Sequence, residues 1–335
     1  MTSLPRKVII AGASGLLGSS LASQLESEGH TLLRLSRDGS DHRAGTVRDL
    51  IIPPALRGGQ RGGVMPRSAS RALPPRNQVY WNPATGEMDS ASLEATDAVV
   101  NLAGRNLTAG RWSESVKRDL YDSRIRSTEL LARTLASLKQ PPKVLISASA
   151  VGYYPSSRTD VFDENSAPGT EFLSTLCRDW EQATRPASEA GIRVVNLRIG
   201  VVLTRLGGML AKVLPIFRLG FGGPIGDGGQ WLSWIALPDL LSLIRHALTD
   251  ERYCGPINAV TETPVTNREF TKSLAQALHR PAFLPVPAFG ISLLFGEMGR
   301  QTVLASQNVT PKRLKELDFK WQHPHLPRFL NSEMT

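Results

Sequence analysis

Cysteine is scarce in this sequence, and long uninterrupted hydrophobic runs are absent. The 335 residues include two cysteines, Cys177 and Cys254, which are too few for a disulfide framework or a four-thiolate zinc site. A reducing compartment is the simpler assumption, so we expect a cytoplasmic protein, with organellar targeting left open. The uncharged stretch at 281–296 is too short and too interrupted by proline and glycine to be a bilayer helix. We therefore expect no membrane partner.

Basic residues outnumber acidic residues, and much of the excess lies in one segment of the sequence. Basic residues number 39 and acidic residues 30, a net charge of +9, which raises the question of a nucleic-acid partner. Residues 41–77 contain seven arginines against Asp41 and Asp49, and so carry +5 of this excess. The stretch is rich in glycine and proline and has no aromatic residue, which predicts a disordered insertion. We therefore do not expect nucleic acid as a partner.

The N-terminal segment predicts the opening of a parallel sheet. An apolar run at 8–11 is followed by a glycine cluster, a helical pattern at 17–28 and a second apolar run at 31–35. Strand, turn, helix and strand in this order form a βαβ unit. Later strands are predicted at 98–102, 143–147 and 192–197, and helices at 113–138 and 171–189. The alternation predicts an α/β fold with a Rossmann-type doubly wound parallel sheet.

Gly12, Gly15 and Gly18 form a GxxGxxG motif between the first predicted strand and its helix. Glycine permits a tight turn and a close approach of the backbone to a pyrophosphate, whose charge then meets free N–H groups at the helix N-terminus. Because the motif lies between two strands at the right distances, it predicts a dinucleotide site.

The residues at the end of the second strand bear on which dinucleotide binds. Ser36 and Arg37 offer a hydroxyl and a guanidinium, which suit the 2′-phosphate of NADP(H). The alternative is that Arg37 is merely solvated and Asp38 binds the ribose of NAD. We favour NADP(H).

Other segments resemble the short-chain dehydrogenase/reductase family. The run DAVVNLAG at 97–104 looks like the family's NxAG signature, and LISASAVGYY at 145–154 resembles the strand with the active-site serine. More specific are the segments at 217–226, 230–235 and 279–283. Together they resemble the atypical extended group of epimerase family proteins, relatives of the NAD-dependent epimerases/dehydratases that end in a small domain of unknown function. The resemblance covers about residues 6–38 and 79–325, and the insertion at 41–77 lies outside it.

This resemblance implies a cofactor, a substrate class and a domain organisation. NADP(H) would be the cofactor and a small molecule the substrate, with a homodimer left open. Residues 6–250 would form the NADP(H)-binding Rossmann domain, with loops on the substrate side at 205–235, and residues 251–330 a small C-terminal α/β domain. The implied cofactor-binding residues are Gly12, Ser14, Gly15, Leu16, Leu17, Ser36, Arg37, Leu102, Ala103, Gly104 and Arg124.

The family's catalytic pair is missing. Its dehydrogenases use Tyr-x-x-x-Lys, in which the lysine lowers the pKa of the tyrosine so that the phenol can pass a proton. None of the five tyrosines has a lysine four residues later. Alignment on Glu181 places Leu173 and Cys177 at the two positions, and neither can do this chemistry.

Two readings of the reaction remain open. In one, the catalytic residues are Ser149, Tyr153 and Tyr154: one of the tyrosines is the acid, Ser149 is its hydrogen-bond partner, and Arg158 or another cation lowers its pKa. The chain is then an NADP(H)-dependent oxidoreductase or epimerase-like enzyme of unidentified substrate. In the other, the two tyrosines only pack at the rim, and the chain is a non-catalytic NADP(H) sensor or interaction protein. Arg198 would hold either a substrate acid or a carboxylate of the protein. No metal site is predicted.

Overall fold

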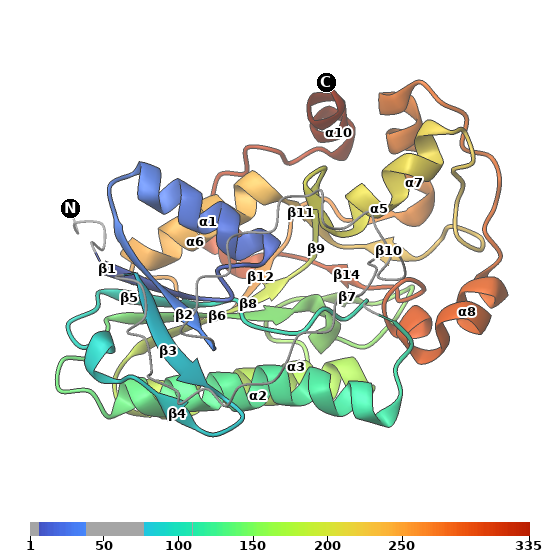
Figure 1. The fold of residues 1–335 in the computed structure, drawn as a ribbon. Helices are drawn as coiled ribbons and strands as arrows, with labels where there is room; N and C mark the ends of the chain where they lie inside the picture. The colour runs from blue at the N-terminus through green and yellow to red at the C-terminus, as the bar shows by residue number, and fades with distance from the viewer. Residues whose placement is uncertain (1–6, 38–76, 109) are drawn as a thin grey trace, which may run out of the picture.

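An eight-stranded sheet forms the centre of the computed structural model, which describes residues 7–37, 77–108 and 110–335 (Figure 1). Its strand order is β12-β8-β6-β5-β1-β2-β3-β4, and every neighbouring pair is parallel except β3 and β4. The strands are β1 (Lys7–Ala11), β2 (Thr31–Ser36), β3 (Gln78–Asn82), β4 (Glu87–Met88), β5 (Ala98–Asn101), β6 (Val144–Ala150), β8 (Arg193–Ile199) and β12 (Gly255–Ala259). The insertion predicted to be disordered, 41–77, lies outside the described residues except for Asn77. Asp38, the alternative ligand of the ribose, also lies outside them.

Helices cover both faces of the sheet, which confirms the predicted α/β Rossmann-type fold. In Figure 1, α1 (Leu16–Ser27) and α6 (Leu237–Thr249) lie on one face, and α2 (Glu114–Ala136) and α3 (Phe172–Gln182) on the other. The apolar strands are buried from both sides: in β1, Val8 and Ile10 belong to one core and Ile9 to the other. This two-sided burial explains why the strands read as continuous apolar runs.

One predicted helix proves to be two. The pattern at 171–189 forms α3 and then α4 (Arg185–Glu189). Pro186 lies in the first turn of α4, where its missing N–H is tolerated, whereas in the interior of a longer helix it would remove a hydrogen bond. The break follows from this proline.

The glycine-rich stretch at 205–235 contains more regular structure than the sequence predicted. It includes α5 (Gly208–Arg218), whose Leu210, Leu214 and Phe217 are buried. Glycines at both ends of α5 obscured this helical spacing. The short strands of this region and beyond are β9 (Val201–Thr204), β10 (Trp231–Leu232), β11 (Trp234–Ala236) and β13 (Val265–Thr266).

The C-terminal part of the chain packs beside α5. It contains α7 (Asn267–Leu278), α8 (Ala288–Gln301), β14 (Asn308–Val309), α9 (Lys312–Glu316) and α10 (Leu326–Met334), and β14 pairs with β7 (Val161–Phe162). Phe329 of α10 is buried in one cluster with Phe270 of α7 and Leu214 of α5. The domain boundary at residue 250 stays a prediction, and the central sheet takes β12 from beyond it.

Candidate cofactor and catalytic site

The glycine turn lies where the strand order reverses, between β1 and β5. Gly12 has a φ of +79°, which a residue with a Cβ rarely adopts. A Cβ at Gly12 would lie 2.6 Å from the carbonyl oxygen of Leu102, at the end of β5. Ligands of open parallel sheets bind at such a switch point. The turn predicted from the GxxGxxG motif is therefore held tightly against β5.

The N-terminus of α1 is open above this turn. Gly15 is the N-cap, no side chain caps the helix, and its first turn has no acidic residue. Ser14 and Gly15 are exposed, while Leu16 and Leu17 are half-buried and present their backbone N–H groups to this end. A Cβ at Gly15 would meet only the Gly12 carbonyl, at 3.4 Å, so the protein leaves room there. Free N–H groups at a helix N-terminus suit a pyrophosphate.

The three residues after β5 line the other side of the switch point. The Leu102 N–H donates to the Ala11 carbonyl at 2.9 Å, and the Ala103 N–H donates to Oδ1 of Asn101 at 3.3 Å. Gly104 is exposed. These bonds turn the chain away from the sheet and bring Leu102, Ala103 and Gly104 next to the glycine turn.

Arg124 is a buried cation beside this segment. Its guanidinium donates to the carbonyls of Leu120 and Arg105, at 3.2 Å and 2.9 Å, and a Cβ at Gly104 would lie 3.2 Å from its Cζ. Burial lowers the pKa of Arg124, and no carboxylate among the described residues pairs with it. A buried charge without an anion is costly, so the position fits an anionic cofactor.

Ser36 and Arg37 lie at the carboxyl end of β2, the strand next to β1. Ser36 is half-buried and Arg37 is exposed. Both are on the edge of the sheet that carries the glycine turn, where a 2′-phosphate would have to be bound.

Leu173 and Cys177, which the alignment on Glu181 puts at the tyrosine and lysine positions of the usual pair, lie side by side on α3. Both come from α3 and face Gly152, in the short helix η4 (Val151–Tyr153) that follows β6. A Cβ at Gly152 would lie 3.6 Å from Cβ of Leu173 and 3.8 Å from Sγ of Cys177. Burial raises the pKa of Cys177 to about 12, so its thiol is neither a nucleophile nor an acid near neutral pH.

Ser149, Glu181 and Arg198 form a buried polar cluster at the end of β6. The Ser149 hydroxyl donates to Oε1 of Glu181 at 2.7 Å. Arg198 donates to both Glu181 oxygens at 2.9 Å. Burial opposes the charge of Arg198, but its bonds to Glu181 outweigh burial and raise its pKa. The alternative left open for Arg198 is thus decided: it pairs with a carboxylate of the protein.

Tyr153 and Tyr154 differ sharply in their surroundings. Arg198 lies over the ring of Tyr153, with Cζ 3.6 Å from the centroid, and Tyr153 is half-buried. Tyr154 is 1% exposed; its hydroxyl donates to Oδ1 of Asn258 at 2.7 Å and accepts from Nη1 of Arg198 at 2.9 Å. Burial raises the pKa of Tyr154 to about 12. These contacts give Tyr154 a packing role, while Tyr153 is accessible.

Two details differ from the predicted arrangement. Ser149 bonds to Glu181 and not to a tyrosine. Arg158, offered as the cation beside the phenol, instead pairs with Asp227 at 2.5 Å on the surface. The cation beside the tyrosines is Arg198.

Sequence reasoning missed two further buried residues that contact this cluster and its tyrosines, Asn258 and Glu164. Asn258 comes from β12, and its N–H donates to Oε1 of the buried Glu164 at 3.0 Å. Burial raises the pKa of Glu164. Both residues reach Tyr154 and Arg198 only through tertiary packing, so no local motif could have pointed to them. Within the described part of the chain, no group of three or more His, Cys, Asp or Glu residues is placed to hold a metal ion.

The doubly wound sheet and the glycine turn at its switch point define a Rossmann-type protein of the short-chain dehydrogenase/reductase class. More particularly, the chain belongs to the NAD dependent epimerase/dehydratase family, which matches residues 8–257. A domain of unknown function, DUF1731, matches residues 286–332. The predicted family resemblance is therefore confirmed.

Relatives of similar length occur in bacteria, plants and animals. An epimerase family protein of Mycobacterium bovis is 39% identical over 94% of this chain and 93% of its own. The Arabidopsis thaliana protein named epimerase family protein SDR39U1 homolog, chloroplastic, is 36% identical over 98% of this chain and 86% of its own. The crystal structure of human epimerase family protein SDR39U1 (isoform2) with NADPH superimposes with a TM-score of 0.80 at 31% identity, covering 98% of this chain and 99% of that one. NADP(H), predicted from the sequence, is the cofactor in that structure.

Proposed function

We propose that this chain is an NADP(H)-dependent oxidoreductase or epimerase-like enzyme of a small-molecule substrate, in which Tyr153 replaces the tyrosine of the missing pair. The observation that carries the proposal is the contact between Arg198 and the ring of Tyr153, 3.6 Å from Cζ to centroid. It places the guanidinium of Arg198, which Glu181 holds through two hydrogen bonds, against the ring face of an accessible phenol at the carboxyl end of β6.

The residues present fit NADP(H). The open N-terminus of α1 would bind the pyrophosphate. The buried guanidinium of Arg124, which pairs with no carboxylate among the described residues, would lie beside the ligand. Arg37 would bind the 2′-phosphate through paired hydrogen bonds. The bound dinucleotide supplies or accepts a hydride. The NADPH in the human relative supports the same choice for this chain.

The protein's own groups would handle the proton. Tyr153 would exchange it with the substrate oxygen, and Arg198 would stabilise negative charge that develops on the phenol. Glu181 holds Arg198 in place through two hydrogen bonds and also fixes Ser149. Ser149 would therefore be a positioning residue, and Leu173 and Cys177 would form an apolar wall beside Gly152.

The test is NADPH oxidation, followed by absorbance with a panel of aldehydes, ketones and keto-sugars. We expect turnover on at least one class, and a loss of about 100-fold or more in kcat for Tyr153→Phe with NADPH affinity unchanged. Tyr154→Phe is the matched control, because it removes the same hydroxyl from a buried neighbour; we expect it to retain kcat. Equal losses in both variants would contradict the role of Tyr153.

A second candidate function has its own support. Because Leu173 and Cys177 occupy the positions of the usual pair, the fold would also suit a sensor that binds NADP(H) without turning it over. NADPH binding in the micromolar range or tighter, together with no oxidation on any carbonyl of the panel, would favour the sensor.

The compartment and the oligomeric state belong to the same proposal. The two cysteines are free, one buried and one exposed, which suits the reducing cytoplasm or the stroma of an organelle. A relative named chloroplastic favours keeping the organellar alternative. Whether the enzyme is a homodimer can be decided by light scattering of the purified chain.

A further inference from the structure

A large apolar patch covers one end of the molecule. Twelve large hydrophobic side chains are exposed among the described residues, and ten of them lie in two short stretches, 216–221 and 283–295. We call these ten the apolar patch: Ile216, Leu219, Phe221, Phe283, Leu284, Val286, Phe289, Leu293, Leu294 and Phe295. Scattered apolar side chains on a surface need no explanation, but a gathering of this size marks an interaction site.

The two stretches are joined in space. The Val286 N–H donates to the Pro224 carbonyl at 2.9 Å, and the Gly226 N–H to the Val286 carbonyl at 2.8 Å. A Cβ at Gly220 would lie 3.5 Å from the ring of Pro281. The loop after α5, the segment after α7 and the start of α8 are therefore adjacent, at the right-hand end of the molecule in Figure 1.

The patch protrudes instead of lining a cleft. Phe289 is 74% exposed, Phe283 is 72% exposed and Leu219 is 71% exposed. Side chains in a substrate pocket are covered by their opposite wall and are far less accessible than this. The occupant of the patch is therefore an extended surface and not a small molecule.

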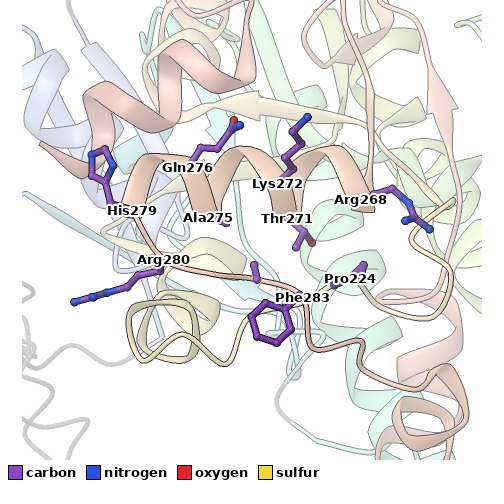
Figure 2. A pocket seen from close by; sticks show the side chains of 10 residues that line it. Pro224, Arg268, Thr271, Lys272, Ala275, Gln276, His279, Arg280 and Phe283 are labelled. Atoms are coloured by element: carbon purple, nitrogen blue, oxygen red, sulfur yellow. The ribbon is translucent and has the colours of Figure 1, made fainter.

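A basic groove adjoins the patch. It has a volume of about 840 Å³, runs along α7 and shares Phe283 with the patch. Figure 2 shows Arg268 and Arg280 at opposite ends of the groove, with Lys272 on α7 between them. We call these residues and His279 the basic groove. Arg218, at the end of α5, is a further exposed cation at the edge of the patch.

The positive charge of this end is not neutralised by neighbouring acids. Asp227 pairs with Arg158, Glu297 pairs with Lys117, and Glu269 closes the capping box of α7. No carboxylate among the described residues pairs with Arg218 or Arg280. Arg218 and Arg280, which are neighbours of patch residues in the sequence, therefore leave positive charge uncompensated beside the apolar patch.

We propose that this end of the molecule is a docking surface for an anionic lipid bilayer. The apolar patch enters the boundary between headgroups and acyl chains, and the basic groove binds phosphate headgroups. Interfacial binding combines these two contributions, apolar burial and attraction to anionic lipid. A second copy of the chain is a poorer occupant, because a two-fold interface would bring the uncompensated arginines of both copies together.

This proposal revises the expectation that the chain has no membrane partner. That expectation was based on the lack of a spanning segment, and none of the described helices is long and apolar enough to cross a bilayer. A peripheral surface needs no such helix. The apolar patch is formed by two stretches that lie about 60 residues apart in the sequence and come together only in the folded chain. A search of the sequence for long apolar runs therefore cannot find it.

The test is flotation of the full chain with vesicles of phosphatidylcholine alone or with added phosphatidylserine. We expect binding only to the anionic vesicles and weaker binding as salt is raised. Phe289→Ser with Leu293→Ser, and separately Arg218→Glu with Arg280→Glu, should each reduce the partition coefficient about tenfold or more. Circular dichroism and NADPH affinity should match wild type, since these residues lie outside the glycine turn.

Two control variants make the same chemical changes elsewhere. Val161→Ser removes an exposed apolar side chain outside the patch, and Lys315→Glu with Lys320→Glu reverses two charges near α9; both should bind like wild type. The proposal is overturned by equal binding to both vesicle types, or by no binding to either. It is also overturned if Phe289→Ser with Leu293→Ser splits a dimer without changing flotation.

Discussion

Arg198 and Glu181 form a two-pronged ion pair inside the protein. Nε meets Oε1 and Nη2 meets Oε2, both at 2.9 Å, and the side chains are 4% and 13% exposed. The pair joins β8 to α3 and orders the groups around it. Ser149 donates to the carboxylate, and the tyrosines lie against the guanidinium. The candidate catalytic cluster depends on this pair for its geometry.

Glu181→Gln should lower the free energy of unfolding by about 3 kcal/mol, because it leaves the buried charge of Arg198 without its counter-ion. The measurement is equilibrium unfolding in urea. Glu189→Gln is the matched control: it breaks the exposed pair with Arg185 and should cost less than about 1 kcal/mol. Similar losses in the two variants would contradict the view that burial makes the Arg198 pair important.

Tyr154 should make the protein less stable at alkaline pH. Its pKa in the folded state is raised to about 12 from a usual 10, so above pH 10 an unfolded chain releases a proton that the folded chain retains. Stability therefore falls as pH rises from about 10 to about 12, by roughly 3 kcal/mol.

Tyr154→Phe should remove this contribution and flatten the fall in stability over that range. Urea unfolding at several pH values measures the slope for both proteins. The variant will be less stable at neutral pH, because Asn258 and Arg198 lose a partner, so the slopes and not the absolute values are compared. An unchanged slope would show that Tyr154 ionises normally.

Gly15→Ala should separate cofactor binding from folding. The backbone of Gly15 is extended at a φ of −78°, and a Cβ there meets only one atom at 3.4 Å. We expect a stability loss below about 1 kcal/mol. The methyl group occupies space that the pyrophosphate needs, so NADPH affinity, measured by calorimetry, should fall at least about tenfold.

Gly29→Ala should show the opposite behaviour. Gly29 has a φ of +83° and nothing within 4 Å of a Cβ, so the substitution strains the backbone at a position remote from the turn. Stability should fall by about 1 kcal/mol while NADPH affinity is retained. A loss of affinity in Gly29→Ala equal to that in Gly15→Ala would indicate a general folding effect.

Arg37→Ala should change cofactor preference. If Arg37 binds the 2′-phosphate, NADPH affinity falls about tenfold or more while NADH affinity stays the same, because only NADPH has this group. Arg34→Ala is the control on the same strand, since Arg34 pairs with Glu26; both affinities should be retained there. Equal losses of NADPH and NADH affinity in Arg37→Ala would contradict the assignment.

Local patterns predicted the core of the fold well. The apolar runs predicted as strands at 98–102 and 192–197 are β5 and β8, and the helix predicted at 113–138 is α2. Strands buried on both faces leave such runs in the sequence. The helix α5 was missed, because flanking glycines at Gly207 and Gly220 made the stretch resemble a loop.

The site was predicted only as far as single segments could show it. The glycine turn is a local motif, so its place at the switch point followed from the sequence. The partner of Arg198 was left open, because α3 must pack on the sheet before Glu181 can reach it. The apolar patch depends in the same way on contacts between distant stretches, which no window of sequence contains.

The positions of Leu173 and Cys177 have a consequence for how this fold can change its chemistry. Both lie on α3, one turn apart, and face the same glycine at the end of β6. The dinucleotide turn, the adjoining strands and Arg124 come from other elements. Under the alignment on Glu181, two substitutions on this one helix would therefore restore the Tyr-x-x-x-Lys pair and leave the nucleotide scaffold intact.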